Sequence, residues 1–163
     1  MPEERRDELR TTYLSLGAGE LFAAAVFAGV ATGVVVPRLG EPDDRLALWS
    51  ALGPLLVVLV QAGVYWLAAR TWVGQRTMPA GMAAVYGAFR LLDPALLVAG
   101  LVGVLVWWPS SSWAAALVLG VWCFGVVEYV NYFVVRLAYP LGETRKIAER
   151  RPPRLVVDVR AAS

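Results

Sequence analysis

Six polar side chains lie inside long apolar stretches of this sequence, and their types suit proton or cation chemistry. They are Glu20, Gln61, Arg90, Asp93, Glu128 and Asn131. An ionised side chain at the centre of a membrane costs about 2.5–3.5 kcal/mol on insertion scales. We therefore expect these side chains to face one another inside a bundle of helices. Three carboxyl groups and one guanidinium would leave two negative charges, so a proton, a bound cation or water must compensate them.

The apolar stretches are long enough to cross a membrane. The sequence is 58% hydrophobic and only 17% charged, a composition typical of membrane proteins. Spans are predicted at residues 15–36, 46–69, 83–108 and 113–137, with a polar segment at 1–14 and a basic tail at 138–163. Because an open sheet cannot satisfy its backbone in lipid, the spans should be helices. The prediction is an all-α integral membrane protein: one domain, an antiparallel four-helix transmembrane bundle.

The basic residues predict the orientation of these spans. Twelve of the fifteen lie in the N-terminal segment, the second connection, the end of the fourth span and the tail, and only Arg38 and Arg45 lie on the other side. Cytoplasmic loops carry the excess of arginine and lysine, so both termini should be cytoplasmic. Tryptophans should mark the interfaces: Trp49, Trp107, Trp108 and Trp113 outside, Trp66 and Trp72 inside. The preference for arginine, with Lys146 as the single lysine, indicates a bacterial inner membrane.

This orientation places all six polar residues at a similar depth. At 1.5 Å per residue they lie in the cytoplasmic half of the bilayer, mostly about 6 to 16 Å from its inner boundary. We expect Arg90 to pair with Asp93 or with Glu128, and we assign a functional role to these three residues. Gln61 and Asn131 fit interhelical hydrogen bonding. Since Asp93 precedes Pro94, its side chain could instead cap a break in the third span.

Small residues in the first span form a second pattern. Gly19, Ala23, Ala25, Gly29 and Gly33 recur at short helical spacings, which lets helices approach closely. We expect this face to pack inside the bundle, with a homo-oligomer or a membrane protein partner as the alternative. The basic tail should meet anionic lipid of the bilayer, and no nucleic acid is expected as a partner.

Several kinds of chemistry are excluded by residue types. The chain has no histidine and a single cysteine, Cys123, so no metal site or cofactor is expected. Glycine-rich phosphate loops and the G-x-S-x-G nucleophile motif are absent. These absences favour a non-enzymatic role. The favoured function is a membrane scaffold or accessory subunit with a polar cluster in its inner half. The first alternative is a small proton- or cation-coupled transporter that uses Glu128 or Asp93. The second is a membrane-embedded enzyme acting on lipid.

Overall fold

The chain folds into four long helices and one short one. The computed structural model describes residues 3–74, 77–134 and 153–162. The helices are α1 (Glu3–Val30), α2 (Pro42–Ala69), α3 (Ala80–Val106), α4 (Ser112–Phe133) and α5 (Arg154–Ala162); α1 continues through a π-helical turn (Ala31–Val35) into a 3₁₀ turn (Val36–Arg38). No strand occurs in the described ranges. The first four helices are long and apolar enough to cross a membrane, which confirms the predicted number of long apolar segments and their helical structure.

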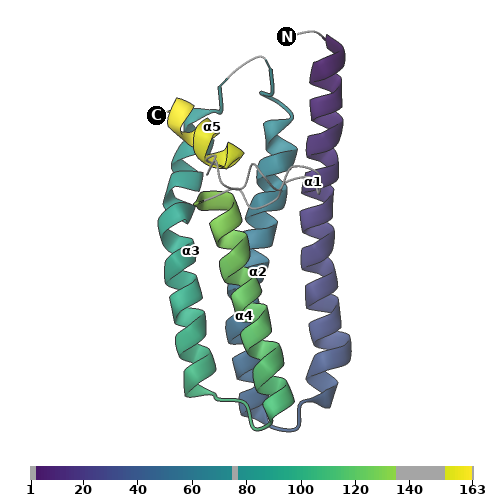
Figure 1. Cartoon of the computed structure of the whole chain (residues 1–163), viewed down its shortest axis with the longest axis vertical. Coiled ribbons are helices and arrows are strands. Elements are labelled where there is room, and N and C mark those ends of the chain that lie inside the picture. Colours follow the sequence, from purple (N-terminus) through teal and green to yellow (C-terminus); the bar gives the residue numbers. More distant parts are fainter. Residues whose placement is uncertain (1–2, 75–76, 135–152, 163) are drawn as a thin grey trace, which may run out of the picture.

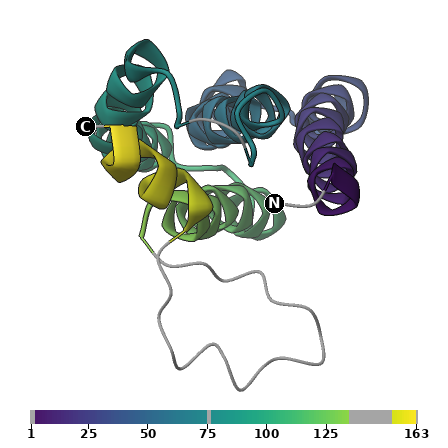
Figure 2. The ribbon, with the colours of Figure 1, turned by 90° about the horizontal axis from the view of Figure 1, so that it is seen from above.

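The four long helices run antiparallel, with α2 at the centre (Figure 1). We call the end with both chain termini the termini end, and the end with the α1–α2 and α3–α4 connections the loop end. Helix α2 contacts α1, α3 and α4, and α5 packs on α3 and α4. Seen from the termini end, α1 and α3 lie on opposite sides of α2 (Figure 2).

The helices differ from the predicted spans, most clearly at the start of α1 and at Pro94. Helix α1 begins at Glu3, so the segment predicted to precede the first span is part of the same helix. Pro94 lies within a continuous α3, so the predicted break capped by Asp93 is wrong. The described part of α4 ends at Phe133, and the predicted end at residue 137 lies outside the described residues, as does most of the basic tail.

Glycines determine how closely α2 approaches its neighbours. A Cβ atom on Gly63 would lie 2.7 Å from Leu21 Cγ and 3.1 Å from the carbonyl oxygen of Gly17 in α1. A Cβ atom on Gly103 of α3 would lie 2.4 Å from the Ser50 hydroxyl. Gly19, Gly29 and Gly33 have nothing within 4 Å of their Cβ positions. The close α1–α2 contact therefore uses Gly17 rather than these members of the predicted stripe.

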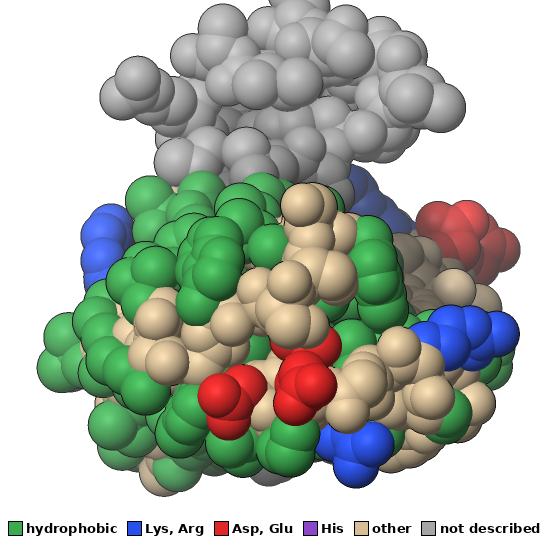
Figure 3. Space-filling view, turned by 90° about the horizontal axis from the view of Figure 1, so that it is seen from below, with side chains coloured by type: hydrophobic (Ala, Val, Ile, Leu, Met, Phe, Trp, Pro, Cys, Tyr) green, Lys and Arg blue, Asp and Glu red, His purple; other side chains and the backbone are tan. Residues whose placement is uncertain are grey.

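The loop end is sealed by apolar packing. Five side chains between the loop end and the middle of the bundle are completely buried: Ala47, Ala51 and Leu55 of α2, Val104 of α3 and Ala114 of α4. Seen from this end, the molecular surface is largely hydrophobic with a few acidic and basic side chains (Figure 3). Asp44 is buried beside the α3–α4 turn, where it accepts hydrogen bonds from the Ser110 amide at 2.7 Å and hydroxyl at 2.8 Å. This contact ties the two loops together.

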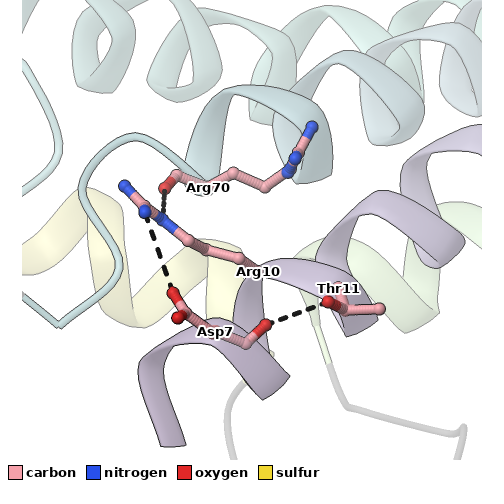
Figure 4. Close-up of polar contacts among 4 residues, drawn as sticks. All are labelled: Asp7, Arg10, Thr11 and Arg70. Atoms are coloured by element: carbon pink, nitrogen blue, oxygen red, sulfur yellow. Dashed lines mark hydrogen bonds and ion pairs between the residues drawn. The ribbon is translucent and has the colours of Figure 1, made fainter. Parts of the chain in front are cut away.

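A polar contact joins α1 to the end of α2 at the termini end (Figure 4). The Arg10 side chain donates from Nε to the backbone carbonyl of Arg70 at 3.2 Å, and its guanidinium lies 3.9 Å from Asp7. A cation at the carboxyl end of a helix meets carbonyl groups that have no partner within the helix. Arg10 thereby helps to hold the first turns of α1 against the bundle.

Candidate functional site

The predicted polar cluster is divided between two places in the bundle. Gln61 of α2 and Asp93 of α3 form one buried pair, in which Gln61 Nε2 donates to Asp93 Oδ1 at 2.9 Å. Glu20 of α1 lies at the other place, where it accepts a hydrogen bond from the Tyr132 hydroxyl of α4. The similar depth predicted for the six residues therefore does not bring them all into one cluster.

Arg90 does not neutralise the charge of Asp93 or of Glu128. Its side chain is exposed, and no ion pair joins it to Asp93 or Glu128 among the described residues. The prediction of such a pair was wrong because Arg90 is on the outer face of α3, whereas Asp93 points toward α2. The Arg90 backbone carbonyl accepts a hydrogen bond from the Tyr129 hydroxyl at 3.1 Å, so this position still contributes a contact between α3 and α4.

A cavity of about 360 Å³ lies at the termini end, bounded by α1, α2, α4 and α5. Its size is in the range of small-ligand pockets. Its lining includes aromatic, acidic, amide and aliphatic side chains: Tyr13, Glu20, Trp66, Asn131, Tyr132 and Leu155. Among the described lining residues Glu20 is the acidic one, and aromatic rings from three helices share the walls with it.

Hydrogen bonds hold the aromatic side chains in place around Glu20. The Tyr132 hydroxyl, which donates to Glu20, accepts from Trp66 Nε1 at 3.3 Å. The rings of Tyr13 and Trp66 lie 4.9 Å apart between centroids. Since Tyr132 and Trp66 are bonded to each other and Trp66 packs on Tyr13, the three rings form a connected wall from α1 through α2 to α4.

A second acidic side chain lies beside the cavity. Glu128 is half-buried, lies close enough to Glu20 for like-charge repulsion, and hydrogen bonds to the Asn131 side chain. No described lysine or arginine forms an ion pair with Glu20 or Glu128. Two neighbouring carboxylates in a low-dielectric region favour the binding of a cation or a proton.

Helix α5 forms one wall of the cavity and is anchored by Asp158. The buried carboxylate accepts hydrogen bonds from the Tyr65 hydroxyl at 2.9 Å and from Trp72 Nε1 at 3.3 Å. Its other oxygen pairs with Arg154 at 3.0 Å. Arg154 also lines the cavity. Helix α5 is thus bonded to α2 and to the segment that follows α2.

Sequence reasoning missed the roles of several residues in this region. Trp72 is predicted to lie at the inner membrane interface, and the structure adds that it is buried and bonded to Asp158. Nothing in the sequence indicated a role for Tyr13 or Asp158, because a tyrosine before the first span and an acid in a polar tail are ordinary features. Tyr132 shares a helical face with Glu128, four residues earlier, and that spacing could have linked it to the acidic cluster.

Comparison of the chain with protein-family models, with curated proteins and with solved structures gives no match. The described residues contain no group of histidine, cysteine, aspartate and glutamate side chains suited to a metal ion.

Proposed function

We propose that the protein is a multi-pass membrane protein that binds a small organic cation in the cavity around Glu20 and works as a cation- or proton-coupled transporter. The observation that carries this proposal is the position of Glu20 in a cavity walled by Tyr13, Trp66 and Tyr132. A carboxylate attracts the positive charge, and aromatic faces stabilise cations by about 0.5–2 kcal/mol each, depending on desolvation. Glu20 thus replaces Glu128 and Asp93 as the proposed binding carboxylate, with Glu128 supporting it electrostatically.

The distribution of arginine supports a bacterial inner-membrane protein with both termini in the cytoplasm. With that orientation the cavity lies in the cytoplasmic half and the sealed loop end faces outward. The apolar packing around Leu55 and Val104 would block passage in this conformation. Transport would then require the helices to rearrange. Anionic lipid is the proposed partner of the basic tail.

The direct test is the binding of tetraethylammonium to the purified protein in lipid nanodiscs. Calorimetry and tryptophan fluorescence measure the affinity. We expect Glu20→Gln to weaken binding at least tenfold, a loss of about 1.4 kcal/mol. Glu8→Gln is the matched control, since Glu8 is an exposed glutamate on the same helix and does not line the cavity. Equal affinities for wild-type protein and Glu20→Gln would contradict the proposal.

A second candidate function is the membrane scaffold or accessory subunit. It is favoured by the number of polar groups that connect one helix to another, such as Trp122 Nε1 donating to the Leu97 carbonyl at 2.8 Å and Tyr86 donating to the Gln61 carbonyl at 2.9 Å. Uptake of tetraethylammonium into proteoliposomes under a pH gradient separates the two functions. Uptake that depends on Glu20 supports the transporter, whereas binding without uptake supports the accessory role.

A further inference from the structure

The Gln61–Asp93 pair is a second polar site, separate from the cavity. Neither residue lines the cavity, and both are enclosed between α2 and α3, with Asp93 1% exposed and Gln61 7% exposed. The single hydrogen bond between them runs from Gln61 Nε2 to Asp93 Oδ1. An amide and a carboxyl group can form two such bonds when they meet side by side.

One oxygen of each side chain is left without a partner. Asp93 Oδ2 and Gln61 Oε1 are both buried and neither has a hydrogen-bond partner. Both are acceptors as long as Asp93 is ionised, so they cannot satisfy each other. In an apolar region each unsatisfied polar atom is costly, and a buried charge without a partner is costlier still.

The charged and titratable side chains nearby do not provide a hydrogen-bond partner for either oxygen. Arg90, one turn earlier on α3, is exposed and not paired with Asp93. The Tyr129 hydroxyl of α4 lies near Arg90 and Asp93, and it donates to the Arg90 carbonyl. On α3 itself, the Tyr86 hydroxyl donates to the Gln61 backbone carbonyl. None of these groups donates to either orphaned oxygen.

We propose that Asp93 binds one proton in the folded protein and uses it to form a cyclic acid–amide pair with Gln61. The proton, taken from water, converts Oδ2 from an acceptor into a donor, and the new O–H bonds to Gln61 Oε1. One proton thereby satisfies both orphaned oxygens and removes the buried charge. Asp93 is then a neutral hydrogen-bonding residue that links α2 to α3, and Arg90 needs no acidic partner. This inference does not depend on cation binding at Glu20.

Infrared spectroscopy of the reconstituted protein near neutral pH tests the proposal, because a protonated carboxyl group absorbs apart from a carboxylate and shifts in heavy water. We expect an acid band that disappears in Asp93→Asn, shifts in Gln61→Leu and remains in Glu20→Gln. Isotope-labelled aspartate in the wild-type protein should shift the same band, so the result does not require a stable variant. An aspartate label that shifts only carboxylate bands would overturn the proposal.

Thermal unfolding provides a second readout on the same residues. The carboxamide of an asparagine carries a donor nitrogen and an acceptor oxygen on one carbon, in the places where a protonated aspartate carries its hydroxyl and its carbonyl oxygen. Asp93→Asn should therefore keep the wild-type melting temperature, and Asp93→Leu should lower it by leaving the Gln61 amide without partners. Equal losses in both variants would show that the pair does not have the acid–amide geometry, and would also overturn the proposal.

Discussion

The hydroxyl of Tyr65 donates a hydrogen bond to the carboxylate of Asp158 at 2.9 Å, across 93 positions of sequence. Tyr65 is completely buried on α2, the central helix, and Asp158 is on α5. Trp72 and Arg154 bond to the same carboxylate. Because hydrogen bonds to a charged group are stronger than neutral ones, this carboxylate anchors α5 over the cavity.

Replacing Asp158 should release α5 while the four long helices stay folded. In Asp158→Ala the bonds to Tyr65, Trp72 and Arg154 are lost together, and each hydrogen bond to a charged group contributes about 1.5–3 kcal/mol. Hydrogen exchange of the α5 amides should become much faster, with little change in α2. Arg160→Gln, at an exposed site on the same helix, is the control. Slow exchange of α5 in Asp158→Ala would show that its apolar side chains are sufficient to hold it.

Enlarging Gly63 should separate α1 from α2. In Gly63→Val the new side chain meets Leu21 and the backbone of Gly17, and overpacking of this kind costs about 1–3 kcal/mol. The melting temperature in detergent should fall. Gly53→Val is the matched control on the same helix, since a Cβ atom there has nothing within 4 Å. Similar melting temperatures for both variants would mean that α1 moves away at no cost.

Trp66 should contribute to cation affinity through its ring. Trp66→Leu keeps an apolar side chain but removes the aromatic face, and the loss of about 0.5–2 kcal/mol corresponds to a roughly 2- to 30-fold weaker affinity for tetraethylammonium. Calorimetry measures this directly. Trp113→Leu is the control, because Trp113 is exposed near the loop end and does not line the cavity. If both variants bind like wild type, the aromatic wall has no part in recognition.

Cysteine labelling should reveal the orientation of the helices. In a Cys123→Ala background, a cysteine at the exposed loop-end residue Gly40 should react with an impermeant maleimide in intact cells. A cysteine at exposed Thr77, in the α2–α3 connection, should react only after the membrane is permeabilised. The reverse pattern would place the termini outside and contradict the prediction made from the arginines.

Hydropathy predicted the four long helices because each apolar run exceeds the length needed to cross a membrane, and Pro54 and Pro94 do not interrupt α2 or α3. The partners of the polar residues were harder to predict. Arg90 and Asp93 are one turn apart, yet the rotation of α3 exposes one and buries the other, and hydropathy alone does not determine that rotation. The Asp158 anchor depends on contacts across 93 positions, which no local pattern reveals.

Helix α5 has a consequence for the order in which the protein is assembled. The four long helices precede it along the chain, so they emerge from the ribosome and can enter the membrane first. The cavity beside Glu20 then lacks the wall that Pro153, Arg154 and Leu155 provide. A stop codon just after α4 would yield the four long helices with the acidic site left open. The finished protein and a truncated one would therefore differ in access to Glu20 rather than in whether the bundle exists.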